Sequence, residues 1–356
     1  MKTNFREIWG SPIKPARCPN CEVAHLIPDD MENALCPACY ESHLEDQPEI
    51  LRPEPPELIL NFIVAPDNVT NLLKDWMRGV WLRPAELDPA ILTARLTRTF
   101  TPMWLVDSRV SGTWGAQMGF DYQVASSQEF YRNGRWITQE VTETRIHWEP
   151  RAGQIDRVYQ NLGVPALEEH HLLVSAVGNY NWKNAQKFTP TPMANASVRV
   201  PSLLPDAAWS LAKSGFDRFA AADCQVAADA QHIEQFTIEA DYLDLNWTQL
   251  LLPLYTTSYR DDDGEVYPIL INGQSGRIFG SKRASQKKAW RWTGGLVAAA
   301  LAFILFTLLS WALAGLLPLL SVLGGVFLVI GLIFAVHAPI PILWAWSHNR
   351  RNKDRD

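Results

Sequence analysis

The feature that most constrains the fold is a long stretch without formal charge near the C-terminus. Between Arg291 and Arg350, 58 consecutive positions contain no Asp, Glu, Lys or Arg. The run from Gly294 to Leu317 would form a helix about 36 Å long, enough to cross a hydrocarbon core of roughly 30 Å. A second apolar run, 319–343, follows Pro318. Two helices joined by a tight turn are therefore expected as a transmembrane hairpin over 294–346.

The residues that flank this hairpin are of the kinds found at membrane interfaces. Indole rings favour the interface, and basic residues on cytoplasmic loops set the orientation of a membrane protein. Both flanks are basic, at 282–293 and in the tail 347–356, whereas the turn has no charge. The pattern predicts a multi-pass protein of the inner (cytoplasmic) membrane with both termini in the cytoplasm. The expected interface residues are Trp290, Trp292, Trp344, Trp346, Lys287, Lys288, Arg291, Arg350 and Arg351. The alternative is a buried helical hairpin, but a globular core has no need of so long an uncharged run.

Four of the five cysteines form two CxxC pairs, Cys18–Cys21 and Cys36–Cys39, with 14 residues between the pairs. Each pair places two thiolates on one tight turn, and two such turns complete a tetrahedral site for one structural Zn²⁺. The N-terminus has no apolar signal segment, so metal ligation is favoured over a disulfide framework. The four-cysteine pattern predicts a zinc ribbon over 1–44.

The charge of the ribbon bears on what it could bind. Residues 1–50 contain four basic and nine acidic residues, a net charge of −5, and the whole chain has a net charge of −6. Phosphate recognition requires the opposite sign. The sequence therefore favours protein contact or a purely structural role for the ribbon, and makes a nucleic-acid partner an unfavoured alternative.

The middle of the chain predicts a mixed α+β region. A Pro- and Glu-rich stretch, 45–58, is expected as a linker, followed by an α+β cytoplasmic region with antiparallel hairpins over 59–281, in one or two subdomains. Helices are expected at 67–80, 84–96, 165–177 and 206–230. Strands are expected at 104–114, 119–124, 129–136, 141–148, 250–259 and 265–271. Turns are expected at Gly112, at Asn133-Gly134, at 150–153 and at 261–264.

No catalytic motif stands out. The run Glu168-Glu169-His170-His171 lacks the spacing of a metalloprotease helix, and its members would point in different directions on a helix. Asp261-Asp262-Asp263 is interpreted as a charged turn, Cys224 as a packed thiol and His337 as an interfacial histidine. The leading expectation is a non-enzymatic protein. A hydrolase with an unrecognised site stays an alternative.

The chain also resembles a known group of proteins. The resemblance rests on CPNC and CPAC at 18–39, on Thr101-Pro-Met-Trp-Leu-Val-Asp107, and on the block from Leu252 to Gly280 with its Asn-Gly-Gln-Ser-Gly turn. These features resemble bacterial zinc-ribbon proteins with a C-terminal transmembrane hairpin, often labelled as similar to the primosomal replication helicase. A helicase motor needs a GxxxxGK(S/T) loop, which is absent from this sequence. Relatives tend to belong to systems with band-7-type and phage-shock-type proteins. The resemblance implies a membrane-associated adaptor, with the lipid bilayer and such proteins as partners.

Overall fold

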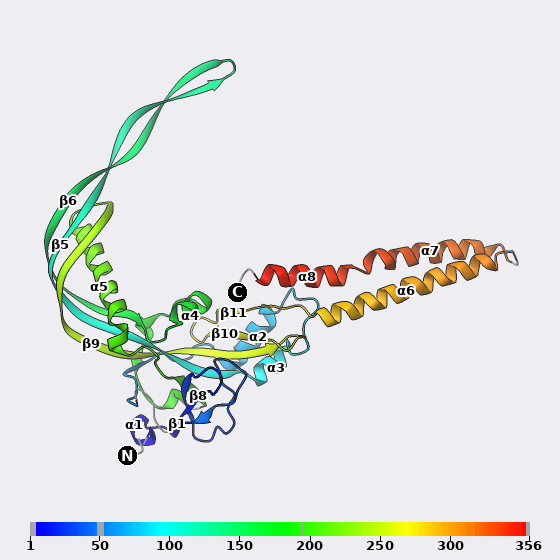
Figure 1. Cartoon of the computed structure of the whole chain (residues 1–356), viewed down its shortest axis with the longest axis horizontal. Helices are drawn as coiled ribbons and strands as arrows, with labels where there is room; N and C mark the ends of the chain where they lie inside the picture. Colours follow the sequence, from blue (N-terminus) through cyan, green and yellow to red (C-terminus); the bar gives the residue numbers. More distant parts are fainter. Residues whose placement is uncertain (1–4, 48–52, 194, 316, 354–356) are drawn as a thin grey trace.

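A computed structural model describes residues 5–47, 53–193, 195–315 and 317–353. It confirms a mixed α+β fold with a sheet and a C-terminal pair of long apolar helices (Figure 1). The strands are β1 (Ile13–Arg17), β2 (Ala24–Pro28), β3 (Glu45–Asp46), β4 (Leu58–Ile59), β5 (Thr97–Arg132), β6 (Arg135–Pro165), β7 (Gln186–Lys187), β8 (Ala196–Arg199), β9 (His232–Arg260), β10 (Val266–Asn272) and β11 (Ile278–Gly280). The helices are α1 (Phe5–Trp9), α2 (Pro66–Trp76), α3 (Pro89–Ala94), α4 (His170–Val177), α5 (Pro205–Ala227), α6 (Gln286–Ala312), α7 (Leu319–His337) and α8 (Ile340–Lys353).

The N-terminal ribbon is part of the main sheet. The strand order is β11-β10-β9-β5-β8-β2-β1-β3, so β8 joins the ribbon hairpin β1–β2 to the long central strands. In this joint His25 pairs with Arg199, and Leu26 pairs with Val198. The segment expected as a linker contributes β3, which pairs with β1, and β4, which pairs with β7 and β9. The ribbon is therefore held to the body by backbone pairing.

The longest strands replace several shorter ones that the sequence predicted. The expected turns at Gly112 and at 150–153 are wrong, because β5 and β6 run through them. Gly112 allows close approach instead: a Cβ there would lie 2.1 Å from the carbonyl oxygen of Glu239 on β9. Pro150 is tolerated because β6 pairs only with β5 and is an edge strand. The Asn133-Gly134 turn is confirmed, with φ of 54° and 80°, as a type I′ turn requires.

Beyond Gly119, where β9 stops pairing, β5 and β6 continue as a two-stranded ribbon that projects from the molecule. We call this ribbon, 120–147, the arm (Figure 1). Closer to the body the sheet curves around α5, which packs Phe216 and Ala212 against Trp104 and Leu162. One helix covers this face, and its bounds confirm the expected helical region 206–230.

The bounds of the other helices differ from the expected ranges to different degrees. α2 lies close to its expected range, whereas the second expected helix is confined to α3, six residues that Asp88 caps through a hydrogen bond from the Ala90 N–H. The helix expected from Pro165 begins only at His170, because β6 extends to Pro165.

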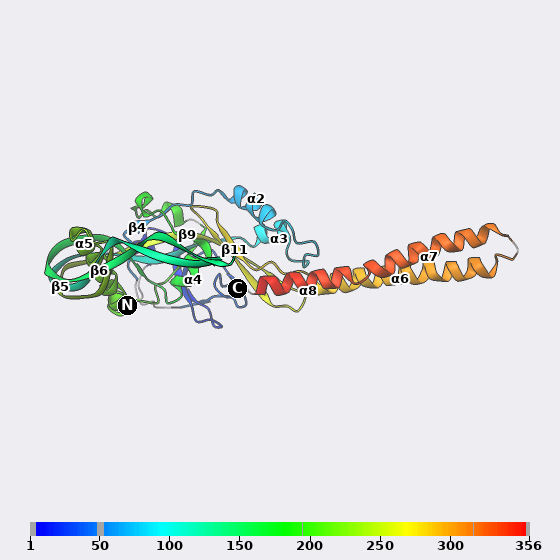
Figure 2. The same ribbon diagram turned by 90° about the horizontal axis from the view of Figure 1, so that it is seen from above.

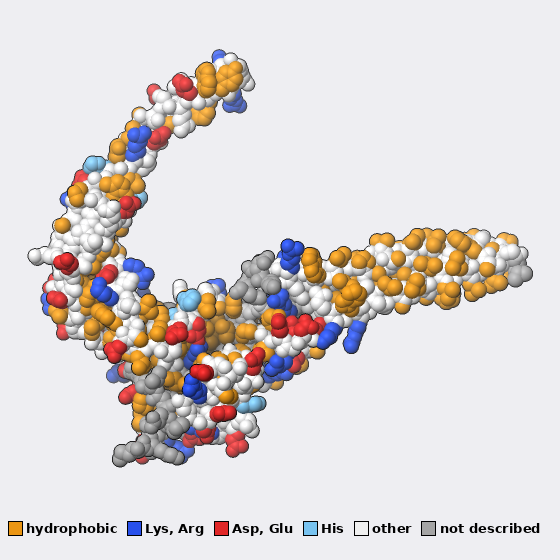
Figure 3. All heavy atoms as spheres, viewed as in Figure 1, with side chains coloured by type: hydrophobic (Ala, Val, Ile, Leu, Met, Phe, Trp, Pro, Cys, Tyr) orange, Lys and Arg blue, Asp and Glu red, His pale blue; other side chains and the backbone are white. Residues whose placement is uncertain are grey.

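The C-terminal helices form a long projection of their own (Figure 2). Two stretches, Gln286–Ala312 and Leu319–Asn352, are long and apolar enough to cross a membrane. Only 11% of the most apolar window of each is buried. Apolar side chains cover the visible face of the projection in Figure 3. These helices therefore do not form the core of a soluble domain, and α8 returns toward the sheet.

Candidate metal centre and the helix junction

The four cysteines of the ribbon converge. One ligand atom from each of Cys18, Cys21, Cys36 and Cys39 lies within 4.8 Å of the others. The Sγ atoms of Cys18 and Cys39 are 3.6 Å apart, as are those of Cys21 and Cys36. Tetrahedral Zn–S bonds of about 2.3 Å place sulfur atoms about 3.8 Å apart. The thiolate set is therefore of the right size for one metal ion.

The two CxxC turns have the same local geometry. The N–H of Glu22 donates to the Cys18 carbonyl, and the N–H of Tyr40 donates to the Cys36 carbonyl, each at 3.0 Å. Glu22 and Tyr40 both have positive φ, 61° and 59°. Each turn thus curls back on its first cysteine, which aims both thiols of the turn at the centre.

The protonation of these thiols depends on their surroundings. Burial raises the pKa of Cys21 and of Cys36. Burial also acts on Cys39, but hydrogen bonds from the backbone of Glu41 and Ser42, together with those of the Cys18 and Asn20 side chains, outweigh it and lower its pKa to about 7. A bound cation stabilises thiolates, so metal binding would release protons from the buried members of the set.

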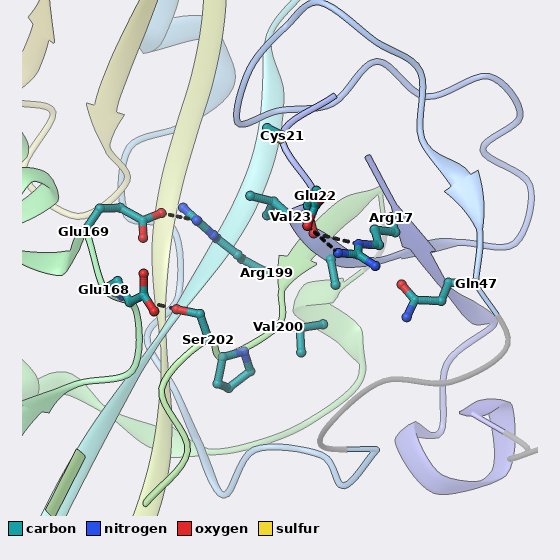
Figure 4. A pocket seen from close by; sticks show the side chains of 12 residues that line it. Arg17, Cys21, Glu22, Val23, Gln47, Glu168, Glu169, Arg199, Val200 and Ser202 are labelled. Carbon is teal, nitrogen blue, oxygen red and sulfur yellow. Dashed lines mark hydrogen bonds and ion pairs between the residues drawn. The ribbon is translucent and has the colours of Figure 1, made fainter. Parts of the chain in front are cut away.

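A pocket of about 670 Å³ lies beside the joint, lined by residues of both the ribbon and the body (Figure 4). Cys21 lines it from the ribbon side, so one side of the metal centre faces this space. Arg17 pairs with Glu22 at 2.8 Å, and Arg199 pairs with Glu169 across the pocket. Both arginines are thus neutralised by carboxylates of the pocket itself.

The Glu168–His171 run is divided between different surroundings, as its spacing predicted. Glu169 pairs with Arg199, and the Glu168 N–H donates to Ser202 Oγ at 3.2 Å. His171 is exposed, whereas burial lowers the pKa of His170. Cys224 is packed beneath the sheet, where burial raises its pKa to about 11. None of these groups forms a nucleophile–base pair with another.

His25, a histidine close to the four cysteines in the sequence, is a buried polar group and not a ligand. It is 1% exposed, and neither ring nitrogen has a hydrogen-bond partner among the residues that the structure describes. Burial, together with the nearby charge of Arg199, lowers its pKa to about 3. Both His25 and Leu26 are buried, and both pair with residues of β8.

The base of the helix pair is bonded to the sheet. Asp262, in the turn between β9 and β10, accepts hydrogen bonds from Ser285 Oγ and from the Lys287 N–H, both at 2.8 Å. The Tyr259 hydroxyl donates to the Ser281 carbonyl and accepts from the Arg283 N–H, both at 2.9 Å. The expected charged turn at 261–264 therefore also caps the start of α6.

The end of α8 is fastened to the same place. The Asn349 side chain accepts from the Ala284 N–H at 2.7 Å and donates to the Ala284 carbonyl at 3.0 Å. Asn352 Nδ2 donates to the Lys282 carbonyl at 2.9 Å. We call this set of contacts, with Asp262 and Ser285, the junction. No sequence motif marked it.

The expected interface residues divide between two environments. Trp290, Trp292 and Trp346 are 65%, 57% and 55% exposed. Trp344 instead packs edge-on against Trp81, with ring centroids 5.7 Å apart, and so belongs to the junction. The basic residues of this set are all exposed, namely Lys287, Lys288, Arg291, Arg350 and Arg351.

Comparison with known proteins found no relative of this chain. No protein-family model matches the chain, and no curated protein or solved structure is significantly similar to it.

Proposed function

We propose that this protein is a zinc-containing adaptor anchored in a cytoplasmic membrane, where it holds partner proteins at the membrane face. The observation that carries the proposal is the junction. A mere tether needs only a flexible linker. Here Asp262 accepts hydrogen bonds that fix the start of α6 to the β9–β10 turn, and Asn349 fixes the end of α8 to Ala284, directly before α6. Such an arrangement orients the sheet and the arm relative to the bilayer.

The helix pair supplies the anchor. α6 and α7 together cross the bilayer twice, with the uncharged turn near Pro318 on the far side. The basic residues at the two bases then lie on the cytoplasmic side, in keeping with the positive-inside pattern. In the proposed topology the sheet, the ribbon and the arm lie in the cytoplasm, and the protein is a multi-pass protein of the inner membrane.

The four thiolates would hold one Zn²⁺. All four coordination positions are filled by Cys18, Cys21, Cys36 and Cys39, so the metal would be structural and would fix the two turns. The ribbon is acidic, which favours a basic protein surface over nucleic acid as its contact. The resemblance to zinc-ribbon membrane proteins points to band-7-type or phage-shock-type proteins as partners.

The test is affinity purification of tagged full-length protein from solubilised membranes, with protein mass spectrometry and metal analysis on one sample. We expect about one zinc per chain and reproducible membrane-associated proteins. Asn349→Ala is the informative variant. The variant protein should still contain zinc and still fractionate with the membrane, but smaller amounts of the partner proteins should co-purify with it. Nucleic acid that co-purifies through high-salt washes, or no reproducible partner, would overturn the adaptor proposal.

A further inference from the structure

The end of the arm combines large apolar side chains with positive charge, and no part of the described structure covers it. Phe130, Tyr131, Trp136 and Ile137 are 47%, 64%, 68% and 40% exposed. We call these residues, with Arg132 and Arg135, the arm tip. Most strongly exposed tryptophans lie on the helix pair or beside its base, such as Trp290 at 65%. Trp136 is as strongly exposed, at 68%, but lies at the far end of a β-ribbon.

The register puts apolar groups on both faces of the tip. Phe130 lies opposite Ile137 on one face, and Tyr131 lies opposite Trp136 on the other, with ring centroids 5.3 Å apart. A ribbon that docks on a protein surface needs only one apolar face. A tip that is apolar on both faces is better matched to a medium that surrounds it on both sides.

The tip also places two positive charges side by side. Arg132 and Arg135 are directly opposite each other across the turn, an arrangement that destabilises a hairpin. Neither arginine forms an ion pair with any residue that the structure describes. Phosphate groups beside the turn would relieve this repulsion and would bind the guanidinium groups strongly.

We propose that the arm tip inserts into the lipid–water interface of the bilayer that holds α6 and α7. Aromatic rings with a polar edge and arginines that reach phosphates are the residues favoured at that interface. The leaflet facing the cytoplasm is negatively charged, so it complements the two arginines. Three residues on each strand extend about 10 Å, close to the depth to which amphipathic segments enter the interface.

The position of the arm agrees with this occupant. Figure 1 shows the arm curving so that its tip turns toward the side on which α6 and α7 extend. The junction holds the start of α6 to the β9–β10 turn and the end of α8 to the segment before α6, and β9 pairs with β5, the strand that continues into the arm. The same chain tethers the tip to the bilayer that holds α6 and α7, so even a weak tip contact is strengthened by tethering. This inference rests on the proposed membrane insertion of α6 and α7.

The first test uses full-length protein in lipid nanodiscs, with the photo-cross-linker p-benzoylphenylalanine in place of Tyr131. The matched control carries it in place of Ser127, an exposed residue on the same face four positions down the arm. We expect lipid adducts several-fold more abundant from position 131 than from position 127. Adducts to protein in place of lipid, or equal lipid adducts from both positions, would overturn the inference.

The second test compares hydrogen exchange of 128–138 in nanodiscs of anionic phosphatidylglycerol and of neutral phosphatidylcholine. Each Arg near an anionic surface contributes about 1 kcal/mol, equivalent to about fivefold in protection. Exchange should therefore be slower in anionic discs, and R132S/R135S should lose the difference. Equal exchange in both discs and in detergent would refute the proposal. Incorporation into nanodiscs is scored separately, so a failure of the anchor is distinguishable from a failure of the tip.

Discussion

At the scale of single residues, the ribbon contains two kinds of buried group with different requirements. The thiols of Cys18 and Cys36 lie within a set that accepts a cation. His25 has no partner for either ring nitrogen. A buried polar group without a hydrogen bond destabilises the folded state by about 1–3 kcal/mol. The first kind stabilises the ribbon when metal is bound, and the second opposes folding.

Removal of one ligand tests the metal centre. Cys18→Ser takes away one of four thiolates and leaves a hydroxyl, a poor zinc ligand, so zinc content should fall from one atom per chain to a small fraction. Hydrogen exchange of β1 and β2 should rise at the same time. Cys224→Ser removes a thiol outside the set and should retain full zinc. Metal analysis of purified protein decides, and equal zinc in the two variants would refute the four-thiolate centre.

His25 predicts acid sensitivity of the ribbon joint. Because burial holds its pKa near 3, an unfolded His25 takes up a proton below about pH 6.5 whereas the folded one does not. Stability is therefore lost as pH falls from about 6.5 toward 3, by about 2 kcal/mol at pH 5. His25→Leu should raise stability at pH 7 and reduce this acid-dependent loss.

The readout for His25→Leu is hydrogen exchange of β2 and β8 at pH 7 and pH 5. His171→Gln changes an exposed histidine and should keep the acid-dependent loss. An unchanged difference between the two pH values in His25→Leu would show that another group causes it.

At the scale of elements, β5 is shaped by its contact with β9. Gly112 meets backbone atoms of Glu239 and Ala240, whereas a Cβ at Gly115 would have its nearest contact at 3.6 Å, an ordinary distance. Backbone cannot move aside as a flexible side chain can. The two glycines lie three residues apart in one strand, so substitution of Gly115 is a matched control for substitution of Gly112.

Gly112→Ala should destabilise the β5–β9 pairing by about 2–3 kcal/mol, because the new methyl group overlaps backbone atoms. Gly115→Ala should change stability by less than about 0.5 kcal/mol. Thermal unfolding and hydrogen exchange of β9 provide the comparison. Similar effects in the two variants would contradict the close approach at Gly112.

The contribution of the junction to the stability of the start of α6 can also be measured. Asp262→Asn keeps the size of the side chain but removes the charge that accepts from Ser285 and Lys287. Hydrogen bonds to charged groups contribute about 1.5–3 kcal/mol, so exchange at 285–289 should rise at least tenfold. Asp263→Asn, one residue further along the same turn, should leave exchange at 285–289 unchanged. No difference between these variants would show that Asp262 does not secure α6.

At the scale of the whole molecule, the arm and the helix pair are two projections from one sheet (Figure 1). The contacts of the arm with the body lie at its root, where Asp121 bonds to His232 at 2.9 Å and to Gln231 at 3.1 Å. Isolated two-stranded ribbons are only marginally stable in water. The rest of the described chain therefore adds little stability to the arm beyond its root.

Shortening the arm separates its role from that of the fold. Deletion of 123–144, with Tyr122 joined to Arg145 through Asn-Gly, keeps the Asp121 contacts and closes a register pair with a two-residue turn. Zinc content, membrane fractionation and the thermal midpoint should stay as in the parent protein, whereas lipid cross-linking through the tip is lost. A lowered thermal midpoint would show that the arm is part of the folding core.

The sequence by itself determined the features that depend on local pattern. Two CxxC pairs predicted the converging thiols, a 58-residue uncharged run predicted the long helices, and Asn133-Gly134 predicted the hairpin turn, because each depends on residues close together in the chain. Tertiary structure decided the rest. Gly112 and Pro150 look like turn residues, but each is accommodated by its place in a strand, beside a close neighbour or at an edge. The buried His25 and the junction join segments far apart in sequence, and no local pattern specifies which distant groups will meet.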